Sequence, residues 1–283
     1  MKQKNISIIG AGTMGCGISQ VFLQNNYKVN LIDISKNILK KSKDKIASSL
    51  SKLVYKEKIT EGEKLKYLSN IKTSTELNLV KDSHLIIEAV GENLDLKRGL
   101  IKKIEDIVSI DVTIASNTSS ISITKLASGA KNPKRIIGLH FFNPAPVLNL
   151  VEVVKGKNTS DKTVSLIIDI VKDIGKEPIV VKDSPGFIVN RLLIPMINEA
   201  VLIYSENISS KEDIDKAMRL GANHKMGPLG LADFIGLDIC LSIMETFYKD
   251  LDNPKYKPAP LLKEMVLSGK LGRKSKQGFY KYR

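Results

Sequence analysis

The sequence predicts a two-domain α/β protein: a doubly wound, mainly parallel sheet followed by a smaller all-helical domain. Short β-branched apolar runs alternate with helical segments through the first half of the chain. That alternation ends at Pro185-Gly186, after which only helical patterns follow. The 283 residues exceed one typical domain but are too few for three substantial ones. We therefore expect two domains, residues 1–185 and 186–283.

The expected elements follow from apolar periodicity and turn residues. Strands that alternate with helices imply βαβ units, and hence a doubly wound sheet. The predicted strands are Ile6–Ile9, Lys28–Ile32, His84–Ala89, Val112–Ser116, Arg135–His140, Leu150–Val154 and Glu177–Val181. The predicted helices lie at about Ser35–Lys58, from Thr60 in a capping-box sequence, near Asp161–Ile174, and at Ile188–Asn207, Lys211–Leu220, Leu231–Tyr248 and Pro260–Ser268.

Composition narrows the class of protein. A hydrophobic content of 42% supports a packed core, and no apolar run is long enough to cross a bilayer, so we expect a cytoplasmic protein without a membrane partner. The net charge of +14 comes from lysines spread along the chain without interleaved aromatics, which favours a solvated surface over a nucleic-acid partner. Cys16 and Cys240 lack metal or redox spacing, so we expect packing roles and no metal.

A glycine motif directly follows the first predicted strand and opens a helix. In Gly10-Ala11-Gly12-Thr13-Met14-Gly15 the first glycine permits the turn, Gly12 lets the backbone approach a pyrophosphate, and Gly15 allows close packing. Asp33 ends the second strand, where a carboxylate accepts both ribose hydroxyls and repels a 2′-phosphate. The pattern predicts a Rossmann-type domain that prefers NAD to NADP, although Lys36 nearby softens that preference.

Two residues at predicted strand positions point to acid–base chemistry. His140 ends a strand, and doubly wound sheets bind ligands at that edge. Glu152 interrupts an apolar strand, where an unpaired carboxylate costs several kcal/mol. His140 is its natural partner, with a lysine-paired edge position as the alternative for Glu152. By contrast, their spacing alone predicts that Glu92 and Lys97 are solvated residues at the two ends of a helix start.

Several long motifs follow one another in order along essentially the whole chain. They are Gly10–Gly15, Ser116–Ser120, Gly138–Pro144, Leu150–Val153, Asp183–Arg191 and Gly272–Tyr280. Together they make the chain resemble the 3-hydroxyacyl-CoA dehydrogenase family, and within it the short bacterial 3-hydroxybutyryl-CoA dehydrogenases. One departure is Lys225, where the family usually has proline.

The resemblance implies an oxidoreductase that transfers a hydride between NAD(H) and a short-chain (S)-3-hydroxyacyl-CoA or 3-oxoacyl-CoA, as in acetoacetyl-CoA reduction. His140 would be the acid/base, supported by Glu152, while Ser119 and Asn190 hydrogen-bond the reacting oxygen. The family's helical domain forms a homodimer interface and closes over the active site. The further cofactor contacts it implies are Glu92, Lys97, Ser119, Asn143 and Lys274.

A basic stripe on the long predicted helix gives a separate argument for the acyl-CoA partner. Lys45, Ser49, Lys52 and Lys56 fall on one continuous helix face, which suits a nucleotide phosphate. The resemblance implies that Ser49, Lys52 and Lys56 hold the CoA nucleotide. A solvated amphipathic helix face is the alternative for each lysine.

Two other functions fit part of the sequence. A β-hydroxyacid or 6-phosphogluconate-type dehydrogenase shares the domain order but generally works through a lysine of the helical domain. A non-catalytic NAD-binding module would keep Gly10–Gly15 and tolerate loss of His140 and Glu152. The joint presence of His140 and Glu152 with Ser119 and Asn190 favours the 3-hydroxyacyl-CoA dehydrogenase.

Overall fold

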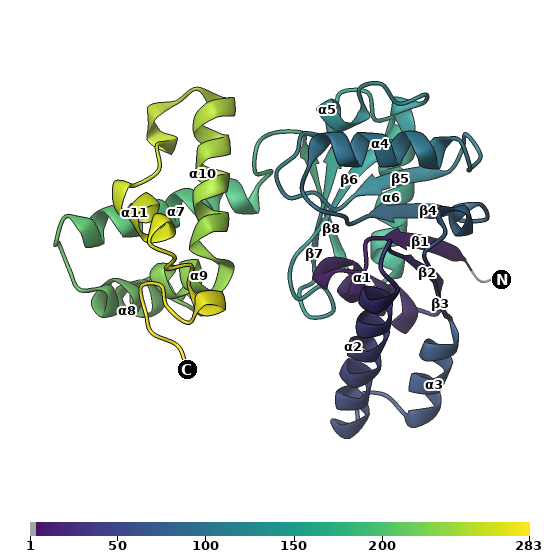
Figure 1. The fold of residues 1–283 in the computed structure, drawn as a ribbon, viewed down its shortest axis with the longest axis horizontal. Helices are drawn as coiled ribbons and strands as arrows, with labels where there is room; N and C mark the ends of the chain where they lie inside the picture. Colours follow the sequence, from purple (N-terminus) through teal and green to yellow (C-terminus); the bar gives the residue numbers. More distant parts are fainter. Residues whose placement is uncertain (1–3) are drawn as a thin grey trace. The chain divides into compact units, whose positions relative to one another are not determined.

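The computed structural model describes residues 4–283, and the chain divides into two compact units with the boundary between Asp183 and Ser184. Each unit has its own buried apolar cluster. The fold class that the sequence predicts is confirmed: the first unit contains a mainly parallel sheet with helices, and the second is helical (Figure 1). In the described part of the chain, no helix is long and apolar enough to span a membrane.

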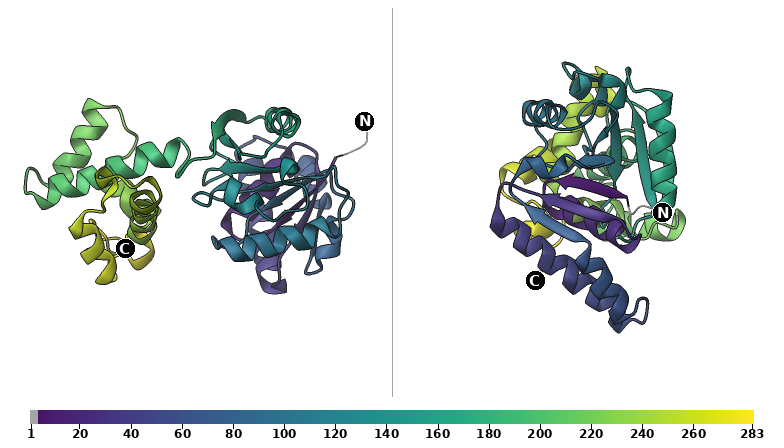
Figure 2. Two further views of the ribbon diagram at one scale, coloured as in Figure 1. Left: turned by 90° about the horizontal axis from the view of Figure 1, so that it is seen from above. Right: turned by 90° about the vertical axis from the view of Figure 1, so that its right-hand side faces the viewer.

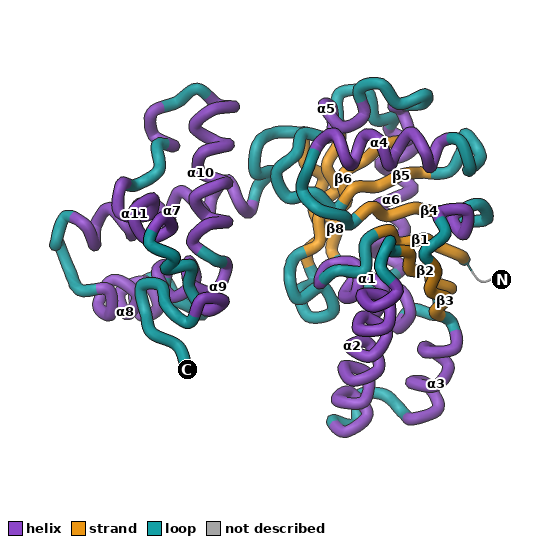
Figure 3. Tube along the Cα trace, in the orientation of Figure 1, coloured by secondary structure: helices purple, strands orange, loops and turns teal. Residues whose placement is uncertain are grey.

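A sheet, drawn in orange in Figure 3, forms the centre of the first unit. It has eight strands in the order β3-β2-β1-β4-β5-β6-β7-β8. All neighbours are parallel except β6 and β7, which are antiparallel. The order reverses beside β1, which is the switch point where such sheets bind ligands at their carboxyl edge. The strands are β1 (Asn5–Ile9), β2 (Lys28–Ile32), β3 (Ile71–Ser74), β4 (Leu85–Glu88), β5 (Thr113–Ser116), β6 (Ile136–Phe141), β7 (Leu150–Lys155) and β8 (Glu177–Lys182).

Helices cover both faces of this sheet, with α4 and α6 on opposite sides (Figure 2). The apolar sides of α1, α2 and α6 pack in one cluster with β1, β2 and β7. The predicted capping box is present at Thr60, whose side chain and Glu63 bond each other's backbone N–H. The helices are α1 (Thr13–Gln24), α2 (Lys36–Tyr55), α3 (Glu61–Ser69), α4 (Leu94–Glu105), α5 (Ile123–Ala127) and α6 (Asp161–Asp173), with 3₁₀ turns η1 (Leu77–Val80) and η2 (Pro133–Arg135).

The second unit packs its helices around Ile197, Leu237 and Phe247, all of which are fully buried. Asp233 is buried as well, and it fixes the C-terminal tail by accepting the backbone N–H groups of Phe279 and Tyr280 at 2.9 and 2.8 Å. The helices are α7 (Val189–Ser205), α8 (Lys211–Gly221), α9 (Pro228–Ile235), α10 (Leu237–Leu251) and α11 (Pro260–Leu267), with 3₁₀ turns η3 (Pro254–Tyr256) and η4 (Arg273–Ser275).

One element prediction was wrong, and one strand was missed. The single helix expected at Leu231–Tyr248 is two helices, because Gly236 adopts φ 110° and breaks the helix between α9 and α10. The edge strand β3 was not predicted. Its sequence, Ile71-Lys72-Thr73-Ser74, contains one large apolar residue and therefore has no strand periodicity that stands out.

Candidate active site

The glycine loop after β1 has the shape of a phosphate site. Gly10 has φ 100°, and a Cβ there would lie 2.5 Å from the Ala89 carbonyl oxygen. A Cβ on Gly15 would lie 1.8 Å from the Gly10 carbonyl oxygen, so α1 can approach the loop only with glycine at this position. A Cβ on Gly12 would meet nothing within 4 Å, and Gly12 precedes the N–H groups that begin α1. The loop therefore leaves open space for an anion at a helix N-terminus.

A carboxylate and an apolar cavity adjoin this loop. Asp33 Oδ2 accepts the Ala11 N–H at 2.8 Å and Oδ1 accepts the Ser35 N–H at 3.0 Å, which fixes the carboxylate at the end of β2. The cavity encloses about 730 Å³. Apolar walls beside a fixed carboxylate suit the adenine and ribose of a dinucleotide. Besides Gly10, Gly12 and Asp33, the lining includes Ile34, Ile38, Thr75, Leu77, Leu96 and Leu100.

His140 and Glu152 form a buried pair on neighbouring strands. They are register partners in the antiparallel pair β6–β7, and His140 Nδ1 lies 2.7 Å from Glu152 Oε2. The exposed fractions of the two residues are 5% and 0%. A carboxylate on Nδ1 selects the tautomer with Nδ1–H and orients the ring, so that Nε2 is the nitrogen available for proton exchange. The Phe142 ring lies 4.4 Å from the His140 ring, measured between centroids.

The segment after β5, which carries Ser119, is held by Glu92. One carboxylate oxygen, Oε1, accepts the backbone N–H groups of Ser119 and Ser120 at 3.0 and 3.1 Å and also accepts both the Thr118 and the Ser120 hydroxyl. Burial raises the pKa of Glu92, but the charge of Lys97 and these hydrogen bonds outweigh it and hold the pKa below its usual value.

Lys97 is not the solvated residue that its spacing suggested. Its side chain is 1% exposed, and Nζ lies 2.6 Å from Glu88 Oε1 and 3.3 Å from Glu92 Oε2. Nζ also donates to the Val90 carbonyl at 3.2 Å. Sequence reasoning missed Glu88 altogether. The signal was available, because Glu88 is a charged residue that ends an apolar strand, as Glu152 is a charged residue inside one.

The other predicted site residues have varied environments. In the first unit, Asn143 is exposed and precedes a cis peptide bond to Pro144. On α2, Ser49 is half-buried and Lys52 is exposed; Lys56, which directly follows the last residue of the helix, is exposed as well. The second unit contains Asn190, half-buried in the first turn of α7, and Lys274, whose Nζ lies 2.5 Å from the Asp238 carboxylate.

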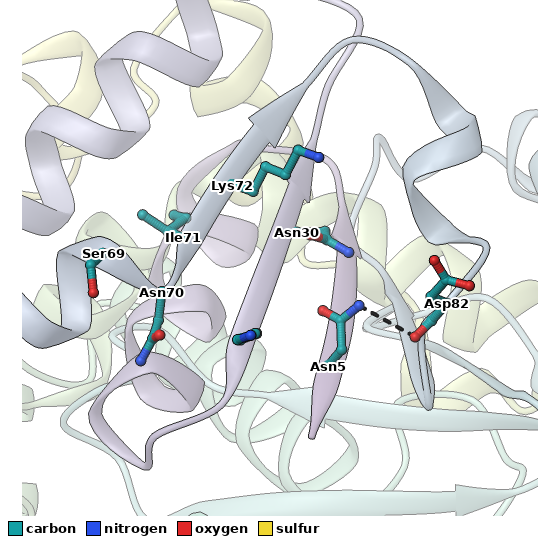
Figure 4. A pocket seen from close by; sticks show the side chains of 8 residues that line it. Asn5, Asn30, Ser69, Asn70, Ile71, Lys72 and Asp82 are labelled. Carbon is teal, nitrogen blue, oxygen red and sulfur yellow. Dashed lines mark hydrogen bonds between the residues drawn. The ribbon is translucent and has the colours of Figure 1, made fainter. Parts of the chain in front are cut away.

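A further cavity, of about 400 Å³, lies at the opposite edge of the sheet (Figure 4). Asn5, Lys28 and Ile71, which begin β1, β2 and β3, contribute to its lining, and Asn5 Nδ2 donates to the Asp82 carbonyl at 3.3 Å. Because it lies at the amino ends of the strands, this cavity is separate from the site at their carboxyl ends. Within residues 4–283, no three His, Cys, Asp or Glu side chains group to hold a metal ion.

Comparisons with known proteins cover both units. Residues 5–184 match the family described as "3-hydroxyacyl-CoA dehydrogenase, NAD binding domain", and residues 186–282 match "3-hydroxyacyl-CoA dehydrogenase, C-terminal domain". The chain is 46% identical over 277 residues to a 3-hydroxybutyryl-CoA dehydrogenase of Clostridioides difficile, covering 98% of this chain and 99% of the relative. It is 44% identical over 287 residues to the human mitochondrial hydroxyacyl-coenzyme A dehydrogenase, covering 99% and 91%. The crystal structure of (S)-3-hydroxybutyryl-CoA dehydrogenase from Ralstonia eutropha superposes with a TM-score of 0.97 at 49% identity, covering 100% of both chains.

Proposed function

Because this chain belongs to the 3-hydroxyacyl-CoA dehydrogenase family and is an NAD-dependent oxidoreductase, we propose that it interconverts acetoacetyl-CoA and (S)-3-hydroxybutyryl-CoA. The single observation that carries the chemistry is the buried His140–Glu152 pair at the carboxyl edge of β6. A buried, oriented imidazole is the group that such a reaction needs, since the 3-oxygen gains or loses a proton in each turnover.

The residues of the first unit fit NAD(H). The open space at Gly12 and the N–H groups of α1 would hold the pyrophosphate, Asp33 would bind the ribose hydroxyls, and the apolar cavity would accommodate the adenine. The further contacts that we propose are Glu92, Lys97, Ser119 and Asn143 of the first unit and Lys274 of the second. When bound, NADH supplies the hydride for the 3-carbon of the substrate.

His140 moves the proton of the reaction. In the reducing direction, Nε2–H of the imidazolium donates its proton to the 3-oxygen of acetoacetyl-CoA as the carbonyl becomes an alcohol. Glu152 stabilises the imidazolium through Nδ1 and keeps the ring in one orientation. Ser119 and Asn190 donate hydrogen bonds to the reacting oxygen and thereby stabilise the charge that develops on it.

The substrate's CoA nucleotide is assigned to α2. Lys52 is exposed near the C-terminal end of this helix, Lys56 is exposed at the residue that directly follows it, and Ser49 is half-buried three residues before Lys52. Together they offer two positive charges and a hydroxyl to its phosphates. We further propose that the chain acts in the cytoplasm as a homodimer through its helical unit, residues 186–283.

Substrate and cofactor comparisons test this function. NADH absorbance is followed with acetoacetyl-CoA, with free acetoacetate, and with NADPH in place of NADH. We expect rapid turnover of the thioester, little turnover of the free acid, and a preference for NADH because Asp33 repels a 2′-phosphate. Equal turnover of free hydroxy or oxo acids would favour a β-hydroxyacid dehydrogenase, and binding of NADH without any turnover would favour a non-catalytic NAD-binding module.

A further inference from the structure

Three ionised side chains form a row beneath the carboxyl ends of β4 and β5. Glu88 Oε1 lies 2.6 Å from Lys97 Nζ and also accepts the Val90 N–H at 2.7 Å. Glu88 Oε2 accepts the Ser116 hydroxyl at 2.6 Å. Lys97 Nζ then reaches Glu92 Oε2 at 3.3 Å. The row therefore connects the last residue of β4 to the last residue of β5 and, through Lys97, to Glu92.

The inner part of this row is fully buried. The side chain of Glu88 is 0% exposed and that of Lys97 is 1% exposed, whereas Glu92 is 36% exposed. A buried ammonium or carboxylate that loses its partner costs several kcal/mol. The positions of the three side chains therefore depend on one another. Removing the charge of Glu88 takes away the nearest partner of Lys97, so that Lys97 can move.

The outer end of the row holds the segment that carries Ser119. Glu92 Oε1 accepts the N–H groups of Ser119 and Ser120, and Ser116 Oγ accepts the Thr118 N–H at 3.3 Å. Two chains of contacts therefore connect Glu88 to residues 118–120. One runs through Lys97 and Glu92, and the other runs through Ser116.

We propose that Glu88 is a positioning residue of the reaction: it fixes Lys97, and through Lys97, Glu92 and Ser116 it holds Ser119 where Ser119 meets the reacting oxygen. This inference rests on the proposed function, because that function gives Ser119 its role. Glu88 touches neither substrate nor cofactor in this account. Glu88 affects the rate only by fixing the position of Ser119, because small displacements of a group that aligns the substrate slow the chemical step.

Glu88→Gln tests the proposal, with Glu105→Gln as a matched control. Glu105 is also a buried carboxylate. It pairs with Arg135 Nη2 at 3.2 Å and accepts the backbone N–H groups of Lys131 and Asn132, but it has no contact with residues 118–120. We expect Glu88→Gln to lower kcat about 10-fold or more, with the KM for NADH changed less, and Glu105→Gln to leave kcat unchanged.

A double-mutant cycle with Ser119→Ala distinguishes positioning from general damage. If Glu88 acts through Ser119, Glu88→Gln has less than about a twofold effect on kcat in the Ser119→Ala background. An equal effect in both backgrounds, or a loss of kcat in Glu105→Gln as large as in Glu88→Gln, overturns the proposal. If Glu88→Gln does not fold, Ser116→Ala is used instead, because it removes only the contact between Glu88 and Ser116. We expect Ser116→Ala to lower kcat less than Glu88→Gln would, and to have no effect on kcat in the Ser119→Ala background.

Amide hydrogen exchange provides a readout that does not depend on activity. The Ser119 and Ser120 amides are expected to exchange about tenfold faster or more in Glu88→Gln than in the wild type, and at the wild-type rate in Glu105→Gln. Unchanged exchange at both amides in Glu88→Gln contradicts the proposal even if the wild type reduces acetoacetyl-CoA. Absence of wild-type turnover, with the exchange pattern as expected, instead contradicts the proposed function and leaves the positioning of this segment by Glu88 supported.

Discussion

Glu152 lies directly opposite His140 in the antiparallel pair of β6 and β7, and its Oε2 lies 2.7 Å from His140 Nδ1. This relationship depends on strand register, because a slip of one residue would place the two side chains on opposite faces of the sheet. The neighbouring pairs Leu139–Val153 and Phe141–Val151 are all fully or almost fully buried, so burial of these apolar side chains fixes the register. The apolar core thus sets the geometry of the His140–Glu152 pair.

Replacing Glu152 with glutamine is expected to lower kcat about 10- to 100-fold. The amide oxygen still accepts Nδ1–H and preserves the tautomer, but the charge that stabilises the imidazolium is lost. Steady-state kinetics with acetoacetyl-CoA and NADH measure the effect, with Glu105→Gln as the buried-carboxylate control. A glutamine variant with wild-type kcat would remove Glu152 from the mechanism.

Two glycines of the loop are expected to respond differently to alanine. Gly15→Ala brings Cβ against the Gly10 carbonyl and should destabilise the fold by about 1–3 kcal/mol or more. Gly12→Ala meets no protein atom within 4 Å, so its stability should stay within about 0.5 kcal/mol while the Kd for NADH rises at least about tenfold. Thermal unfolding and NADH fluorescence titration separate the two effects. Wild-type NADH affinity in Gly12→Ala would contradict the assigned pyrophosphate position.

The first part of the fold was predictable because its strands are buried and apolar. Lys28–Ile32 agrees to the residue with β2, since its apolar residues Val29, Leu31 and Ile32 are buried and turn residues bound the segment. Gly236 shows the limit of periodicity, because the apolar pattern continues across it while its φ of 110° separates α9 from α10. β3 shows a second limit of periodicity, because a strand at the sheet edge requires few apolar residues and so leaves no clear apolar pattern.

The candidate site, like the fold, could be predicted only in part from the sequence. His140 and Glu152 were paired from the cost of an unpartnered carboxylate in an apolar strand, and the structure has that pair. The same argument applies to Glu88, but its partner Lys97 lies nine residues away on α4, and only the tertiary fold shows that this lysine points inward. The roles of Ser119 and Asn190 came from the resemblance alone, since neither residue type is unusual at its position.

Alanine at Lys52 and Lys56 is expected to raise the KM for acetoacetyl-CoA about fivefold for each substitution and to leave the KM for NADH unchanged. Both side chains are exposed, so their attraction to phosphates is screened, and the wild-type KM for the thioester should also rise with salt. Lys172→Ala, at an exposed position of α6, is the matched control. Equal effects of all three substitutions would indicate a general effect of charge rather than a site.

Glu92 is expected to make a pH-dependent contribution to stability. Its pKa is lowered in the folded protein, so the contribution is complete above the usual glutamate value of about 4.3 and is lost as the pH falls through the lower folded value. The free energy of unfolding of the wild type should therefore exceed that of Glu92→Gln by less than about 1 kcal/mol near pH 7, because solvent screens a carboxylate that is 36% exposed, and this difference should shrink at acidic pH. Denaturant unfolding at several pH values measures it. A difference that stays constant or grows on acidification would contradict the hydrogen-bonded, ionised state of Glu92.

The most direct test of the account is the kcat for NADH-dependent reduction of acetoacetyl-CoA by wild type and by His140→Asn, with the Kd for NADH measured in parallel. Asparagine fills part of the same space and cannot exchange the proton. The account predicts rapid wild-type turnover, a loss of about 10²- to 10⁴-fold in the variant, and an NADH affinity that does not change. Undiminished turnover in the variant would contradict the assignment of His140 as the acid/base.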